Sequence, residues 1–62
     1  MMNNKGYYTT EEIAKMLSIH VATVRRWIRE GKLPAILLGK SYRVTKQDLR
    51  QFLEDRRTNR VK

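Results

Sequence analysis

Three arginines, Arg25, Arg26 and Arg29, follow two small residues, Val21 and Ala22, in a segment with helical spacing. A guanidinium group presents a rigid fork of N–H donors, which pairs in a bidentate manner with guanine or with a phosphate. Small side chains one turn earlier let a helix come close to base edges. The chemistry indicated by this segment is recognition of a nucleic acid through hydrogen bonds and charge.

The charge of the chain is concentrated around this segment. The 62 residues include 14 Lys and Arg against 6 Asp and Glu, a net charge of +8. Residues 20–46 hold seven of the basic residues and one acidic residue, Glu30, and therefore six of the eight net charges. A polyanionic partner is favoured. A membrane surface is the rival polyanion, but the cations lie in several predicted elements rather than along one amphipathic helix, so we expect no membrane partner.

Other chemistry lacks the necessary residues. There is no cysteine and a single histidine, His20, which leaves no ligand set for a metal ion. The acidic residues fall at helix caps or among cations, no nucleophile–base pair stands out, and a chain of this length has little room for a water-excluding pocket. We therefore expect a protein that is not an enzyme, with no metal, no cofactor and no small-molecule ligand.

Length and composition predict one small domain, because 40% hydrophobic and 32% charged residues are ordinary proportions for a folded chain. No apolar run approaches the roughly 20 residues of a membrane span. The polar start of the chain lacks the apolar core of a signal peptide. We expect a cytoplasmic protein.

Helical periodicity begins after Thr9. The spacing of apolar residues predicts a first helix over about 10–17. Thr9 and Glu12 have the spacing of a capping box, and Tyr8 can pack against Ile13 as a hydrophobic staple.

A second helical pattern follows a short break. Ser18 stands where such turns often have glycine, so a left-handed backbone is expected to strain it. His20 takes the cap position of the second helix, and Gly31 the position of its C-terminal stop. Val24, Trp27 and Ile28 share the inner face, and Trp27 is interpreted as core rather than as a base-stacking residue. The outer face then consists of Val21, Ala22, Arg25, Arg26 and Arg29. Two short helices joined in this way predict a helix-turn-helix.

The period changes after Pro34. Residues 35–38 and 41–44 read as two strands joined at Gly39 and Lys40, which suit a two-residue hairpin turn. In the second strand Tyr42 is expected to face inward and Arg43 to face solvent.

A third helix is expected to open at Thr45, where Asp48 would complete a second capping box, and to end near Asp55. The domain is expected to span 7–55, after a lead of residues 1–6. A basic tail, residues 56–62, follows, either to contact phosphates or to keep the chain soluble. The predicted core consists of Ile13, Ala14, Leu17, Ile19, Val24, Trp27, Ile28, Leu33, Tyr42, Val44, Leu49, Phe52 and Leu53.

Together these elements predict a mainly α-helical fold with a small β-hairpin, a winged helix-turn-helix. Such a fold places the second helix in the major groove of double-stranded DNA. The predicted recognition-helix residues are His20, Val21, Ala22, Thr23, Arg25, Arg26 and Arg29. The predicted residues of the wing and its flanks are Lys32, Lys40, Ser41, Arg43 and Lys46.

Four segments carry a resemblance to a known family: YTTEEIA (8–14), TVRRWIREGKLPA (23–35), GKSYRV (39–44) and DL (48–49). They resemble the excisionase-type, MerR-like DNA-binding domains. The resemblance implies that Val21–Arg29 is the recognition helix and 40–43 the wing. His20 departs from the Ser or Thr usual at the family's helix cap, which implies a weaker cap or a phosphate contact.

Several roles are compatible with this resemblance. The first is an excisionase or recombination directionality factor of bacterial, phage or mobile-element origin, acting with further copies of itself or with an integrase or recombinase. The second is a small transcription regulator, and the third is the DNA-targeting domain of a larger transposase or recombinase. An RNA-binding or protein-interaction module is the distant alternative.

Overall fold

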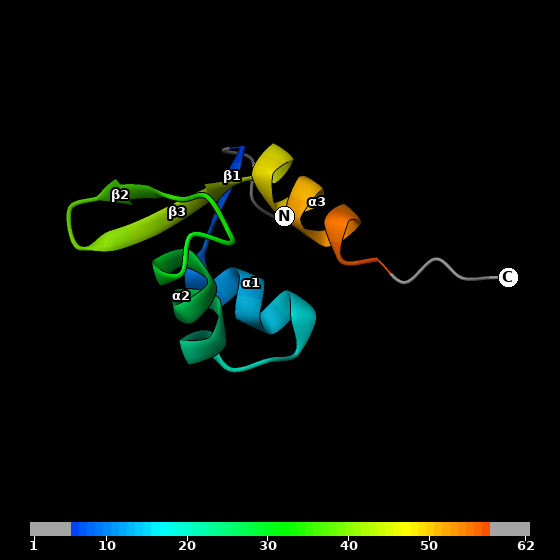
Figure 1. The fold of residues 1–62 in the computed structure, drawn as a ribbon. Helices are drawn as coiled ribbons and strands as arrows, with labels where there is room; N and C mark the ends of the chain where they lie inside the picture. Colours follow the sequence, from blue (N-terminus) through cyan, green and yellow to red (C-terminus); the bar gives the residue numbers. More distant parts are fainter. Residues whose placement is uncertain (1–5, 58–62) are drawn as a thin grey trace, which may run out of the picture.

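The computed structural model describes residues 6–57. All of the predicted N-terminal lead except Gly6, and positions 58–62 of the predicted basic tail, lie outside the described residues. The elements follow in the order β1 (Tyr7–Thr9), α1 (Thr10–Leu17), α2 (Val21–Arg29), β2 (Ile36–Leu38), β3 (Ser41–Thr45) and α3 (Lys46–Asp55) (Figure 1). This arrangement confirms the predicted fold class.

The start of α1 is fixed by the predicted capping box. The Glu12 amide donates to Thr9 Oγ1 at 3.0 Å, and the Thr9 amide donates to Glu12 Oε1 at 2.8 Å. Both bonds satisfy amides that have no partner inside the helix. Ala14, one turn later, is buried where α1 packs against α2.

Two helices end in the same hydrogen-bonded motif, built on different residues. At the end of α2 the Lys32 amide donates to Trp27 O and the Gly31 amide donates to Ile28 O, with Gly31 at φ 78°. At the end of α1 the amides of the two residues after Leu17 donate two equivalent bonds to carbonyls of the helix. The left-handed residue in this turn is Ser18, at φ 57°. This Schellman pattern needs a left-handed residue, which glycine adopts without cost and serine does not. The expected strain at Ser18 is therefore present in the backbone.

Replacing Ser18 by glycine is expected to stabilise the domain. The left-handed conformation costs a non-glycine residue about 1–2 kcal/mol, part of which is offset by the greater freedom of glycine in the unfolded chain. We expect a gain of about 0.5–1 kcal/mol in the free energy of unfolding, measured by urea titration. Ser18→Ala, which keeps the strain, is the control and should give no gain. Equal stability of the two variants would show that the gain does not come from relief of backbone strain at this position.

The sheet has three strands, one more than the sequence indicated. The hairpin forms as predicted, with Leu38 opposite Ser41 and Gly39 at φ 64° in the two-residue turn. The additional strand, β1, pairs antiparallel with β3 and places Tyr8 opposite Val44, giving the order β1-β3-β2. The tyrosines before the α1 cap thus anchor the first helix to the hairpin.

The core lies where α1, α2, α3 and the root of the hairpin meet. The residues of the predicted core that are buried are Ile13, Ala14, Val24, Leu33, Val44, Leu49 and Phe52. Leu17, Ile19, Trp27 and Ile28 are half-buried and pack against these residues. Two core predictions are wrong. Tyr42 is half-buried outside this cluster, because β3 extends beyond the helices there, and Leu53 is 39% exposed.

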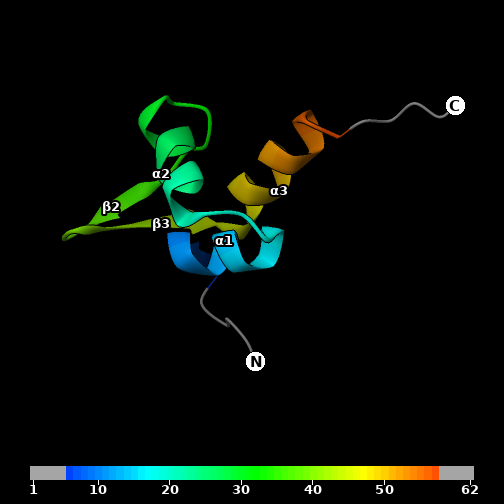
Figure 2. The same cartoon turned by 90° about the horizontal axis from the view of Figure 1, so that it is seen from below.

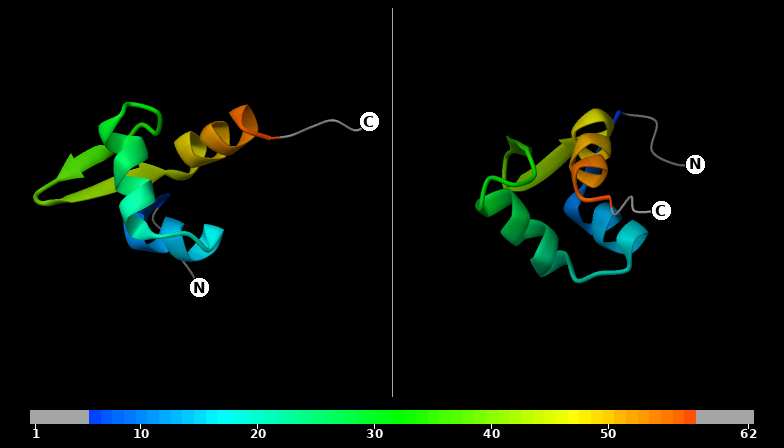
Figure 3. Two further views of the ribbon diagram at one scale, coloured as in Figure 1. Left: turned by 60° about the horizontal axis from the view of Figure 1, so that its bottom comes forward. Right: turned by 45° about the vertical axis from the view of Figure 1, so that its right-hand side comes forward.

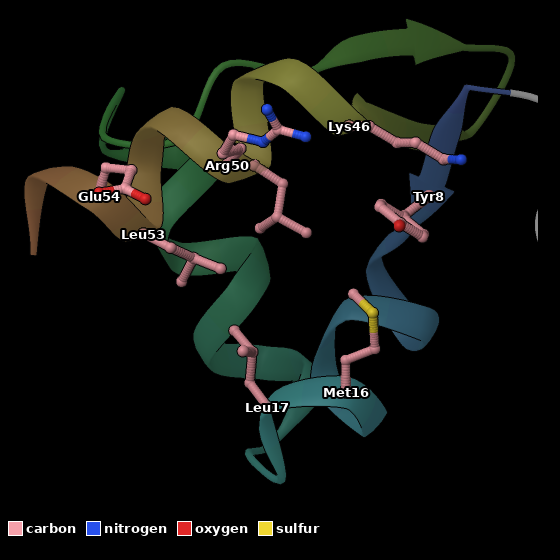
Figure 4. Close-up of a pocket in the computed structure, with 8 residues that line it drawn as sticks. Tyr8, Met16, Leu17, Lys46, Arg50, Leu53 and Glu54 are labelled. Carbon is pink, nitrogen blue, oxygen red and sulfur yellow. The ribbon is translucent and has the colours of Figure 1, made fainter. Parts of the chain in front are cut away.

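Leu53 lies instead in a groove between α1 and α3 of about 350 Å³. The residues lining this α1–α3 groove are Tyr8, Met16, Leu17, Lys46, Leu49, Arg50, Leu53 and Glu54. In Figure 4 the side chains of Leu17 and Leu53 point toward each other across it. Leu53 therefore remains accessible, although it has the helical spacing of a core residue.

Thr45 caps α3, because its Oγ1 accepts from the Asp48 amide at 3.0 Å. This is one of the two bonds of the predicted capping box, so the cap is confirmed but the reciprocal box is not. Near its end the Phe52 ring lies 4.8 Å from the Trp27 ring, centroid to centroid. The Arg56 guanidinium lies 3.8 Å from the Phe52 ring centroid. Arg57 forms an ion pair with Glu54 at 3.0 Å. The two described arginines of the predicted tail are therefore held against α3.

Candidate nucleic-acid interface

The outer face of α2 is cationic and largely accessible. Ala22, Arg25, Arg26 and Arg29 are exposed, as the helical periodicity indicated. The expectation for Val21 is wrong, because its side chain is half-buried and packs against the core. The reason is its place in the first turn of α2, where the chain passes close to the packed end of α1.

The start of α2 carries no side-chain cap. His20 occupies the cap position in an extended conformation, but its imidazole makes no capping hydrogen bond. Its carbonyl accepts from the amide of half-buried Thr23 at 3.0 Å. The side chain of His20 is exposed and remains available to a partner.

The wing, which we define as residues 36–45, extends beyond the helices and lies alongside α2 (Figures 1 and 2). Lys40 and Ser41 are exposed at its tip. Arg43 is half-buried rather than fully in solvent, and its Nη1 donates to Tyr42 O at 3.3 Å. The strand β2 exposes three aliphatic side chains, Ile36, Leu37 and Leu38, an apolar flank that the sequence analysis assigned no role.

The two predicted flanking lysines lie in different places. Lys32 follows α2, and its Nζ lies 3.2 Å from Glu30 Oε1. Lys46 lines the α1–α3 groove (Figure 4), so the structure does not group it with the outer face of α2. The cationic surface formed by α2 and the wing therefore contains fewer residues than the sequence predicted.

Two acidic side chains are paired with this surface. Glu30 lies 3.9 Å from Arg26 and also contacts Lys32. Glu11, from the first turn of α1, accepts from Arg25 Nη2 at 3.2 Å. The second contact joins residues 14 positions apart, so no sequence spacing indicated it.

A cleft of about 410 Å³ separates α2 from the wing. The residues lining this Glu11 cleft are Thr9, Thr10, Glu11, Arg25, Lys40, Ser41, Tyr42 and Arg43. The pKa of Glu11 lies below its ordinary value, first because backbone and Thr10 hydroxyl hydrogen bonds stabilise the carboxylate, and further because Arg25 and Arg43 are near. Glu11 and Tyr42 are site residues that the sequence analysis missed.

Within residues 6–57 no group of three or more His, Cys, Asp or Glu side chains is placed to hold a metal ion. No helix in the same part of the chain has the length and apolar character needed to cross a membrane. The arrangement can bind a partner through guanidinium, ammonium and hydroxyl donors on two adjacent elements.

Comparison with known proteins gives matches over most of the domain. In Bacillus subtilis, the "Uncharacterized protein YvgK" is 41% identical over 51 residues, which are 82% of this chain and 17% of that protein. In Mycobacterium tuberculosis, the "Putative DNA-binding protein Rv0500A" is 35% identical over 46 residues, 74% of this chain and 59% of that protein. The chain thus spans less than two thirds of either relative. No solved structure was found to match it.

The family comparison covers the described elements from β1 to the end of α3. Residues 7–57 match the model of a family described as "Helix-turn-helix domain". The matched range contains the cap of α1, the turn at Ser18, the cationic α2 and the wing. The chain therefore belongs to this helix-turn-helix domain family.

Proposed function

We propose that the chain is a sequence-specific double-stranded DNA-binding protein, in which α2 enters the major groove and the wing contacts the adjacent backbone or minor groove. The observation that carries the proposal is the exposed cationic face of α2 beside the basic wing. Membership of the helix-turn-helix family and the name of the mycobacterial relative support DNA as the partner. Helix-turn-helix proteins read bases with their second helix.

The positions of the basic side chains suggest a division of roles. We assign Arg25 and Arg26, one turn into α2, to base edges, where bidentate contacts distinguish guanine from other bases. Arg29, Lys40 and Arg43 are assigned to phosphates, which set the register of the protein on the duplex and carry no sequence information.

The proposal is tested by titrating the purified chain, at physiological salt, with duplex DNA, single-stranded DNA and a structured RNA. We expect the duplex to bind tightest, and selection from randomised duplexes to yield a preferred site. Affinity should fall steeply with salt, because bound cations release counterions from the DNA. Tighter binding to the RNA, or equal binding to all duplexes, would contradict sequence-specific DNA recognition.

The wing gives a separate prediction. Replacing Lys40 by alanine is expected to weaken binding to all duplexes by a similar factor and to lower the slope of log affinity against log salt by about 1. Arg50→Ala, which removes the same charge beside the α1–α3 groove, is the control and should change neither quantity. A loss confined to the preferred sequence would instead assign Lys40 to base readout.

For the biological role we propose an accessory factor of the excisionase type, which bends DNA and acts with further copies or with an integrase or recombinase. Bending of a preferred site, measured by the mobility of circularly permuted fragments, tests this role. Two alternatives are a small MerR-like regulator and the DNA-targeting domain of a larger protein.

A further inference from the structure

The carboxylate of Glu11 lies against the outer face of α2, although the residue belongs to α1. Its Oε2 atom accepts a hydrogen bond from Arg25 Nη2 at 3.2 Å. Its Oε1 atom accepts one from Thr10 Oγ1, also at 3.2 Å. Thr10 itself is 4% exposed, so it is fixed in the packed part of the domain. A chain of contacts thus leads from a buried threonine, through the exposed carboxylate, to an exposed arginine of α2.

We infer that Glu11 is a positioning residue for sequence readout, holding the Arg25 guanidinium in the orientation that meets a base edge. The inference rests on the proposed function, because it concerns the same DNA-binding surface. The contact engages one nitrogen of the guanidinium, Nη2, while an arginine side chain carries five N–H donors in a planar fork. Most of the fork therefore stays available for a bidentate contact with a base.

The negative charge of Glu11, like its hydrogen bond, favours the proposed orientation of the Arg25 guanidinium. Arg25, Lys40 and Arg43 line one cleft, and a guanidinium there without an anionic neighbour would turn toward the nearest phosphate. Phosphate contacts add affinity for every sequence equally, whereas base contacts separate one sequence from another. By occupying one donor of Arg25, the carboxylate lowers indiscriminate binding and preserves the contact that discriminates.

The chain offers a matched control for the charge of Glu11. Glu54 also forms an exposed ion pair with an arginine, Arg57, at 3.0 Å. Glu54 lies on α3, which extends away from the wing in Figure 1 and in the left-hand view of Figure 3, and Arg57 follows the end of that helix. Glu54→Gln and Glu11→Gln therefore change the net charge identically, but only Glu11→Gln releases an arginine of α2.

The test compares wild type, Glu11→Gln and Glu54→Gln on two duplexes, the site selected from a randomised library and a scrambled duplex of the same composition. For Glu11→Gln the preference for the selected site should fall about fivefold or more, the loss expected for a weakened bidentate contact. Its binding to the scrambled duplex should tighten, with a salt slope steeper by about 0.9, the value for one added phosphate contact. Glu54→Gln should leave the preference unchanged.

A double substitution separates positioning from a general effect of charge. In an Arg25→Ala background, Glu11→Gln should cause no further loss of preference, because the residue it positions is gone. The same loss in that background, or an undiminished preference in Glu11→Gln alone, would overturn the inference. The proposed function fails by a different result, namely a wild-type protein that binds both duplexes equally.

Discussion

Replacing Arg25 and Arg26 together by alanine is expected to weaken binding to the preferred duplex by about a hundredfold or more. Each bidentate contact to a base contributes about 1–3 kcal/mol of discrimination, and both side chains project from the exposed face of α2. The measurement is a fluorescence anisotropy titration of the labelled duplex. The preference over a scrambled duplex should fall with the affinity.

The control for this prediction removes one arginine of α3, Arg50, and one that follows this helix, Arg57. Arg50 and Arg57 are both exposed, and Arg57 is paired with Glu54, so their joint replacement lowers the net charge by the same two units. This variant should retain the preference for the selected site, and both variants should keep the wild-type circular dichroism spectrum. Unchanged binding after loss of Arg25 and Arg26 would refute the assignment of α2 as the recognition helix.

Phe52→Ala is expected to have the largest effect on stability. Phe52 is 3% exposed and contacts both the Trp27 ring and the Arg56 guanidinium. Truncating a buried phenylalanine costs about 3–5 kcal/mol, which approaches the whole stability that a core of this size supplies. Urea unfolding monitored by circular dichroism should show a chain that is partly or wholly unfolded in buffer.

The neighbouring residue, Leu53, provides the control for Phe52. Its side chain is 39% exposed in the α1–α3 groove, so Leu53→Ala should cost less than about 1 kcal/mol. Equal destabilisation by the two substitutions would mean that α3 packs through a different face from the one in the structure.

Local signals predicted the helical elements and the hairpin. The capping box at Thr9, the turn glycines Gly31 and Gly39, and the strained serine at Ser18 each depend on neighbours within a few residues. Such features are visible in a sequence because the interacting groups are close along the chain.

Contacts between distant residues were not predictable in the same way. The strand β1 has three residues, too few to show a period, and it exists because it pairs with β3 more than 30 positions later. Leu53 has the spacing of a core residue, but its exposure depends on the distance between α1 and α3. The sequence pattern alone indicates neither the pairing of β1 with β3 nor the distance between α1 and α3.

The candidate site shows the same division. Helical geometry assigned Ala22, Arg25, Arg26 and Arg29 to one exposed face, and the structure agrees. It could not indicate that Glu11 reaches Arg25, because that contact depends on the crossing of α1 over α2. Lys46, placed with the wing on the basis of its charge, lies in the α1–α3 groove.

The most direct test of DNA recognition by α2 is an amide chemical-shift titration of the labelled protein with its preferred duplex. The expected changes lie in α2 and at the wing tip, from Lys40 to Arg43, with residues of the α1–α3 groove such as Met16 and Leu53 unaffected. Changes concentrated in that groove, with α2 unperturbed, would contradict recognition of DNA by this helix.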